Sequence, residues 1–128
     1  MAGAIGVQLA QPQRPVVAVI GDGSAMYNVQ ALWTAAHLKL PIVYVIANNK
    51  GYRILKERLL AYRRNDRFIG MDFNDPAIDF IALAESLGVT AERVVEPAQI
   101  APALRRALAS IGDGPRLLDV RVANGFGD

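Results

Sequence analysis

The sequence predicts an α/β fold with a mostly parallel central sheet and helices on both faces. Two apolar runs, at residues 16–20 and 42–47, are rich in Val and Ile and lack polar alternation, which is typical of parallel strands buried on both faces. Segments with apolar residues at helical spacing follow the runs. Because strands and helices alternate without an internal repeat or a linker, we expect a single domain over residues 1–128 with right-handed crossovers.

The first half of the chain predicts two helices and two strands. Residues 2–10 have the pattern of the last part of a helix, and Pro15 opens the strand at 16–20 after a polar turn. We expect a loop over 21–25 and then a helix over 27–38. The apolar residues of that helix recur at helical spacing, and we expect its Trp33 to lie in the core or at a subunit interface. Pro41 opens the strand at 42–47.

The second half predicts a basic helix over 52–64, an irregular loop over 65–76 and a helix over 78–87 that Gly88 ends. A short strand at 90–95 and an amphipathic helix over 96–110 follow. In the last strand, 116–122, Asp119 and Arg121 alternate with apolar residues, and this pattern predicts a half-exposed strand. We expect residues 123–128 to be frayed.

Composition excludes several classes of protein. The chain has no cysteine, which rules out disulfides and thiolate metal sites, and its apolar runs are too short to cross a bilayer. No signal peptide is visible, so we expect a cytoplasmic protein with no membrane partner. Seven of the fourteen basic residues fall within 50–67, although the net charge is only +2. This stretch indicates the solvated face of a helix, with a polyanion-binding surface as the alternative.

Two turns contain the candidate ligand-binding residues, and each turn follows a predicted buried strand. Asp22 lies between Gly21 and Gly23, where an α/β protein often holds a phosphate that a carboxylate would repel. Met26 is too bulky for a dinucleotide fingerprint, and no Gly-Lys-Ser/Thr sequence forms a P-loop. A Mg²⁺ ion between the carboxylate and a diphosphate would turn the repulsion into attraction. The second turn, at 48–51, would supply further oxygen ligands.

We expect three oxygen ligands from the protein: the Asp22 carboxylate, the Asn49 side-chain carbonyl and the Gly51 main-chain carbonyl. Main-chain amides at residues 23–25 would point at the anion. The alternative for either turn alone is structural, with Asp22 capping the next helix and the asparagines forming an ordinary turn. Ser24 is not expected to be a nucleophile, because no base is recognisable near it in the sequence.

The spacing of the two turns resembles a known signature. A Gly-Asp-Gly at 21–23, twenty-four intervening residues and Asn48-Asn49 are similar to the thiamine-diphosphate motif. Over essentially the whole chain, the sequence resembles the C-terminal cofactor-binding domain of the benzoylformate decarboxylase and acetolactate synthase group. The segments ALWTAA, LPIVYVI and NNKGY are most similar to the benzoylformate decarboxylase branch. The resemblance implies a thiamine-diphosphate-binding fold.

The resemblance also implies the site residues, and it names thiamine diphosphate and Mg²⁺ as cofactors. Asp22, Asn49 and Gly51 would bind the metal. The residues implied to contact the cofactor are Gly21, Asp22, Gly23, Ser24, Asn49, Gly51 and Tyr52. Ile54 and Leu55 on the following helix would approach the substrate, whereas the basic Lys56 and Arg58 depart from an aromatic-substrate pocket.

In the family that the chain resembles, the full enzyme removes CO₂ from a 2-oxo acid, a small molecule, and releases an aldehyde. The alternative within that family is an acetolactate-synthase-like carboligase. The pyrimidine-binding domain, which carries the catalytic glutamate of the family, has no counterpart here, so we expect no catalytic residue in this chain. The chain is expected to be a fragment of a larger multidomain enzyme, and a homo-oligomer. Two alternatives from other classes are a module without catalysis that uses the basic stretch 50–67 to hold RNA or another polyanion, and an inert accessory subunit. For the enzyme domain itself we expect no nucleic-acid partner.

Overall fold

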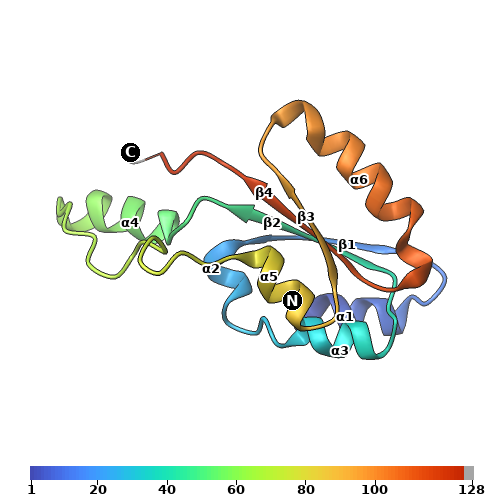
Figure 1. Ribbon diagram of the computed structural model, residues 1–128. Helices are drawn as coiled ribbons and strands as arrows, with labels where there is room; N and C mark the ends of the chain where they lie inside the picture. The colour runs from blue at the N-terminus through green and yellow to red at the C-terminus, as the bar shows by residue number, and fades with distance from the viewer. Residues whose placement is uncertain (126–128) are drawn as a thin grey trace.

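A computed structural model describes residues 1–125 and shows a four-stranded, all-parallel sheet (Figure 1). The strand order is β1-β2-β4-β3, with β1 at Val16–Gly21, β2 at Ile42–Asn48, β3 at Thr90–Val94 and β4 at Arg116–Arg121. Gly21 is in register with Ala47, so the ends of β1 and β2 lie together. The predicted α/β class with a parallel sheet is confirmed. The expected fraying of the C-terminus concerns residues 126–128 in part, and these lie outside the described residues.

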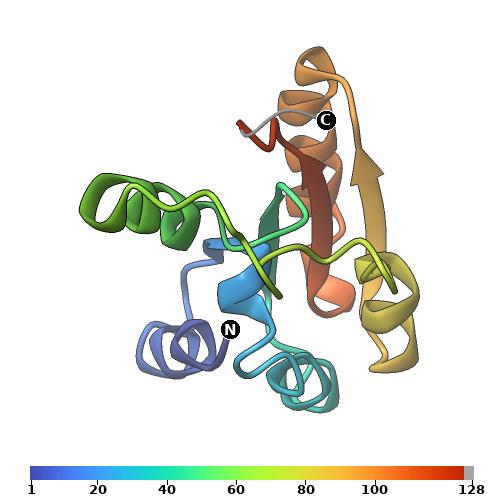
Figure 2. The same ribbon diagram turned by 90° about the vertical axis from the view of Figure 1, so that its left-hand side faces the viewer.

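Helices cover the two faces of the sheet unequally (Figure 2). One face packs against α1 (Ala2–Ala10), α3 (Ala31–His37) and α5 (Phe80–Ser86), and the other against α6 (Ile100–Ala109). The short helix α2 (Asp22–Ala25) follows β1, and α4 (Arg53–Arg63) lies beyond the carboxyl ends of the strands (Figure 1). Two 3₁₀ turns, Pro97–Gln99 and Ile111–Asp113, flank α6.

Each face has its own hydrophobic core. Tyr44, Leu32 and Phe80 are fully buried on the face of the three helices. On the opposite face, small residues of α6, Ala103 and Ala107, let the helix approach the sheet closely. Within residues 1–125, no helix is both long enough and apolar enough to cross a bilayer.

The strand β1 differs from its prediction. We expected residues 16–20 to be buried on both faces, but Val17 is 43% exposed and Val19 is 72% exposed. The reason is that β1 is an edge strand, and α6 packs against β2, β3 and β4 instead of covering it. The apolar run 16–20 therefore has one face in the core and one face exposed to solvent.

The strand β4 differs in the opposite sense. Its alternating Asp119 and Arg121 predicted a half-exposed strand, but β4 lies between β2 and β3 and Asp119 is fully buried. The carboxylate of Asp119 is paired inside the protein instead of facing water, whereas its arginine partners stay partly exposed. Asp119 accepts from Arg93 of β3 at 3.1 Å and pairs with Arg121 at 3.3 Å.

Two helices also begin later than predicted. The segment predicted as a loop at 21–25 contains α2, and turns follow it, so that α3 begins only at Ala31. Trp33 is 56% exposed and stacks on His37 with 5.0 Å between ring centroids, so the prediction of a core position is wrong. Its place at an interface stays a prediction. The helix α5 begins at Phe80 because the Asp79 side chain accepts hydrogen bonds from the amides of the first turn.

Candidate functional site

The two predicted turns meet at the carboxyl edge of the sheet, through the Asp22 carboxylate. Its Oδ2 accepts a hydrogen bond from the Gly51 amide at 3.1 Å, across 29 residues of sequence. Its Oδ1 accepts from the adjacent Gly23 amide at 2.8 Å. Parallel pairing of β1 with β2 explains the meeting, since both strands end at this edge. Asp22 is thus more than a local helix cap, because it joins the two turns.

A second oxygen converges on the same amide. The Asn49 side-chain oxygen also accepts from the Gly51 N–H, at 3.1 Å. Because these two oxygens, one from each turn, accept the same hydrogen, they lie close together. Carboxylate and amide oxygens are the ligands that Mg²⁺ prefers. Within residues 1–125, no three His, Cys, Asp or Glu side chains cluster around a possible metal. A cation here would have one carboxylate, with neutral oxygens completing its shell, which suits Mg²⁺ bound to phosphate and water.

Burial and hydrogen bonds act on the charge of Asp22 in opposite directions. The side chain is buried, and this desolvation raises the pKa of Asp22 above its ordinary value. Hydrogen bonds from backbone amides, those of Gly23 and Gly51 first, lower the pKa and oppose the effect of burial. A divalent cation would favour the charged carboxylate.

A cleft of about 280 Å³ opens over this carboxylate. Among the residues lining it are eight predicted for the site: Gly21, Asp22, Gly23, Ser24, Asn49, Gly51, Tyr52 and Ile54. The predicted substrate residue Leu55 is 46% exposed and does not line the cleft. Ile54, which is 58% exposed, does line it and presents an apolar side chain at its rim.

Two glycines of the turns are required by close packing. A Cβ at Gly23 would lie 2.6 Å from the Tyr52 ring, which itself packs edge-on against Phe73. A Cβ at Gly51 would lie 2.5 Å from the Met71 carbonyl oxygen, a backbone atom. A Cβ at Gly21, in contrast, would meet no atom within 4 Å. The protein therefore excludes side chains at Gly23 and Gly51 on its own account, whereas only a bound ligand would exclude one at Gly21.

Sequence reasoning missed the residues beneath the second turn. Asn48 is buried, and its Nδ2 donates to Oδ1 of Asp119 at 2.7 Å, while its Oδ1 accepts from the Lys50 amide at 3.1 Å. The first asparagine of the pair thus holds the turn, and the second faces the cleft. A signal was present in the sequence: an aspartate within the otherwise apolar run 117–120 is typical of a buried, paired carboxylate.

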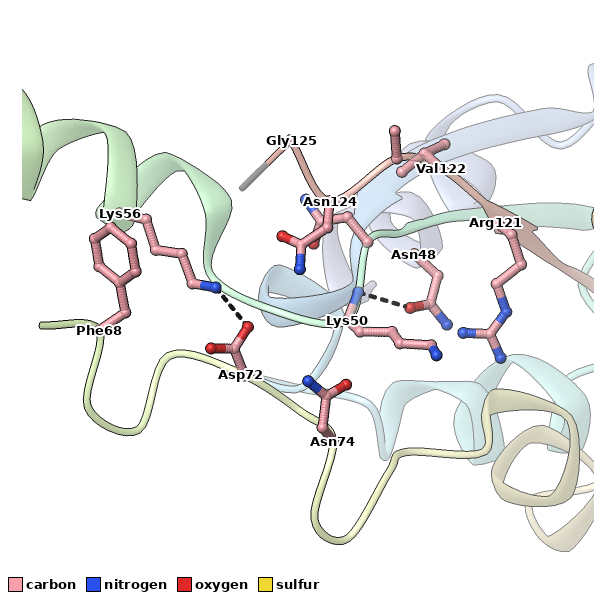
Figure 3. Close-up of a pocket in the computed structure, with 12 residues that line it drawn as sticks. Asn48, Lys50, Lys56, Phe68, Asp72, Asn74, Arg121, Val122, Asn124 and Gly125 are labelled. Atoms are coloured by element: carbon pink, nitrogen blue, oxygen red, sulfur yellow. Dashed lines mark hydrogen bonds and ion pairs between the residues drawn. The ribbon is translucent and has the colours of Figure 1, made fainter. Parts of the chain in front are cut away.

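The basic stretch 50–67 is only partly the solvated face that we predicted. Lys56 is 3% exposed, and its ammonium forms an ion pair with Asp72 from the loop after α4 (Figure 3). Arg53 pairs with Glu57 one turn along α4. Arg58 is exposed. Lys56, named above as a departure from an aromatic-substrate pocket, is therefore buried with its charge balanced by Asp72.

The sequence is similar to those of proteins that bind thiamine pyrophosphate. Residues 1–120 match the family described as thiamine pyrophosphate enzyme, C-terminal TPP binding domain. Benzoylformate decarboxylase of Pseudomonas aeruginosa is 40% identical over 117 residues, which make up 91% of this chain and 21% of that protein. A putative acetolactate synthase large subunit of Mycobacterium tuberculosis is 39% identical over 124 residues, 93% of this chain and 24% of that protein.

A solved structure agrees with the sequence relatives. The thiamine diphosphate-dependent 4-hydroxybenzoylformate decarboxylase of Rhodococcus jostii superposes with a TM-score of 0.87 at 40% identity, over 97% of this chain and 23% of that chain. The present chain thus spans about a quarter or less of the length of these relatives. With the family model covering nearly its whole length, the chain belongs to the thiamine pyrophosphate enzymes and corresponds to their C-terminal cofactor-binding domain.

Proposed function

We propose that this domain holds the diphosphate of thiamine diphosphate through Mg²⁺, as part of a 2-oxo acid decarboxylase most similar to benzoylformate decarboxylase. The observation that carries the proposal is the convergence of Asp22 Oδ2 and Asn49 Oδ1 on the Gly51 amide. These two oxygens, with the Gly51 carbonyl, would be the protein ligands of the metal, and phosphate oxygens and water would complete its shell.

Several residues of the cleft have a part in this proposal. The amides of Gly23 and Ser24, at the start of α2, would donate to the diphosphate, and Tyr52 keeps its ring against Gly23 and closes the side of the cleft. Ile54 would meet the apolar part of the substrate, and Leu55 stands one residue further along α4, outside the cleft. Bound in this cleft, thiamine diphosphate would supply the electron sink that decarboxylation of a 2-oxo acid needs.

The glutamate that activates the cofactor would come from another domain. Glu57 lines the cleft but pairs there with Arg53 at 2.8 Å, and Glu92, which does not line the cleft, pairs with Arg106. We therefore propose that activity needs the pyrimidine-binding domain and assembly of the full enzyme as a homo-oligomer. The absence of cysteine supports a reducing compartment, and we propose the cytoplasm.

The nearest alternative is a carboligase of the acetolactate synthase kind, because the two groups of relatives match at 39% and 40% identity. The substrate separates them: full-length enzyme given benzoylformate would release benzaldehyde, whereas a carboligase given pyruvate would form acetolactate. The polyanion-binding module is less well supported, because ion pairs to Glu57 and Asp72 neutralise two of the basic residues of 50–67.

Calorimetric titration of the chain with thiamine diphosphate tests the proposal. We expect binding only when Mg²⁺ is present, and we expect Asp22→Asn to abolish it, because the amide has no charge to hold the metal. The matched control is Asp113→Asn, which removes an exposed carboxylate far from the cleft and should leave the titration unchanged. Equal binding without the metal, or by the Asp22→Asn variant, would contradict the proposed metal bridge.

A further inference from the structure

A row of polar side chains connects β3 with the second turn of the cleft. At one end, Asp79, the N-cap of α5, accepts a hydrogen bond from Arg93 of β3 at 2.7 Å. Arg93 also donates to Oδ2 of Asp119 at 3.1 Å, and Oδ1 of Asp119 accepts from Asn48 at 2.7 Å. The Asn48 oxygen in turn accepts from the Lys50 amide at 3.1 Å, the bond drawn in Figure 3. The polar row therefore ends inside the second turn.

The polar row fixes the direction in which the Asn48 amide points. Asp119 pairs with both Arg93 and Arg121 as an ionised carboxylate does, and such a group only accepts hydrogen bonds. The Asn48 NH₂ group must therefore face Asp119, and its oxygen is left to face the Lys50 amide. Asp119 is fully buried and Asn48 is 3% exposed, so the protein shields these hydrogen bonds from competing water.

The bond from Asn48 holds Lys50 in a conformation that a lysine rarely adopts. The φ of Lys50 is 62°, in the left-handed region that is uncommon for residues other than glycine. A residue keeps such a conformation only where its surroundings over-determine it. An asparagine that accepts from the amide two residues on closes a tight turn, and here the asparagine is itself held by a buried partner.

The conformation of Lys50 decides where the proposed metal ligands lie. Lys50 stands between Asn49 and Gly51, and the Asn49 side-chain oxygen accepts from the Gly51 amide at 3.1 Å. The same amide donates to Oδ2 of Asp22, also at 3.1 Å. If Lys50 moved to a right-handed or extended conformation, the main chain would change direction between its two neighbours. The two oxygens would then no longer converge on one amide.

We propose that Asp119 is a positioning residue for the metal-binding turn, acting through Asn48 and itself held by Arg93. Neither Asp119 nor Arg93 lines the cleft over Asp22, and Arg93 belongs to β3, at the other edge of the sheet from β1. The effect on Mg²⁺ rests on the proposed function, whereas the effect on the turn can be measured without metal.

An NMR measurement on the metal-free chain tests the positioning of the turn. Left-handed Lys50 should give a strong cross-peak between its amide proton and its own Hα, because a positive φ brings these two protons close. We expect Asp119→Asn to weaken this cross-peak to the level of ordinary residues, while Lys39, which has φ of 49° and precedes β2, keeps its own. The matched control is Leu118→Ala, because Leu118 is a buried neighbour in β4 that packs in the other core, away from Asn48.

Calorimetry with thiamine diphosphate and Mg²⁺ tests the effect on the proposed metal site. We expect Asp119→Asn to raise the Kd by about tenfold or more, as the loss of a group that supports a metal ligand typically does. Leu118→Ala should leave the Kd unchanged at a temperature where both variants are folded. The double variant Asn48→Asp with Asp119→Asn should restore the Lys50 cross-peak, because the reversed hydrogen bond again leaves an acceptor at position 48 for the Lys50 amide.

A second pair of variants serves if Asp119→Asn does not fold. Arg93→Ala should weaken the Lys50 cross-peak in the same direction but less, because Arg121 still pairs with Asp119. Its control is Arg106→Ala, which removes an exposed arginine that pairs with Glu92 outside the polar row. Equal cross-peaks in these two variants would remove Arg93 from the proposal.

Two results would overturn the role of Asp119. One is a Lys50 cross-peak that is as strong in Asp119→Asn as in Leu118→Ala, and the other is an equal Kd for these two variants. If the unchanged chain binds no thiamine diphosphate in the presence of Mg²⁺, the proposed function fails instead. The cross-peak of Lys50 then decides by itself whether Asp119 positions the turn.

Discussion

Replacing Asp119 with Asn should destabilise the domain more than any conservative change on its surface. The carboxylate is fully buried and has three donors around it: Asn48 at 2.7 Å, Arg93 at 3.1 Å and Arg121 at 3.3 Å. The new carboxamide would have one acceptor oxygen and one NH₂ group. Whichever way it turns, NH₂ faces either Asn48 or the two arginines, so a donor meets a donor.

The size of the loss follows from these partners. Hydrogen bonds to a charged group contribute roughly 1.5–3 kcal/mol each. The arginine side chains are 39% and 24% exposed, so water screens their share. The full cost of breaking a buried pair, roughly 3–5 kcal/mol, is therefore an upper limit, and we expect about 3 kcal/mol. That loss is a large part of the roughly 5–15 kcal/mol by which a domain of this kind is stable.

Urea unfolding at pH 7, followed by circular dichroism, measures this loss as a shift in midpoint at constant slope. The matched control is Asp113→Asn, since Asp113 is 83% exposed and pairs with Arg116 only at 3.4 Å; we expect no measurable change. The double variant Asn48→Asp with Asp119→Asn restores the hydrogen bond in the reversed direction and should recover part of the stability. If Asp119→Asn costs no more than the control, or the double variant is less stable than Asp119→Asn alone, the reasoning is wrong.

Three further predictions concern the cleft and the core. Gly51→Ala should cost about 1–3 kcal/mol of unfolding free energy, because its Cβ would meet a backbone oxygen, whereas Gly21→Ala, which has open space, should cost little. Because burial raises the pKa of Asp22, the folded chain binds the carboxyl proton of this residue more tightly than the unfolded chain does. The protonated Asp22 therefore stabilises the fold fully below pH 3.8, and this stabilisation is lost as the pH rises through the raised pKa. Asp22→Asn, which cannot titrate, should therefore flatten the pH dependence of the Tm of the metal-free chain between pH 4 and pH 7. Burial raises the pKa of Tyr44 to about 12, and its hydroxyl has no partner among the described residues, so Tyr44→Phe should keep or raise the Tm at pH 7 and reduce the loss of stability between pH 10 and 12.

The sequence contained enough to predict the class of the fold and the meeting of the two turns. Parallel strands that are neighbours end at the same edge, so Asp22 and Asn49 had to approach each other once residues 16–20 and 42–47 were assigned to strands. The family resemblance rested on the same spacing, and the family match confirms it. The metal ligands themselves stay a prediction, supported by the shared Gly51 amide.

The errors have a common physical origin, since each depends on a neighbour far away in the sequence. The run 16–20 is equally apolar whether a helix covers it or not, so nothing local shows that Val19 is exposed. Asp119 is buried because Asn48, 71 residues earlier, and Arg93 donate to it. Lys56 looked like part of a solvated face because its partner, Asp72, lies in a loop without a regular pattern.

The outer edge of β1 has a consequence for the behaviour of this chain in solution. Along Val16–Gly21 one row of backbone N–H and C=O groups faces no other strand of residues 1–125, and the exposed apolar side chains of Val17 and Val19 lie on this strand. Such an edge is a template on which another β-segment can add, and repeated addition leads to aggregates. Val19→Lys would place a charge beside this edge, and we expect light scattering at rising protein concentration to show fewer aggregates of this variant than of the unchanged chain.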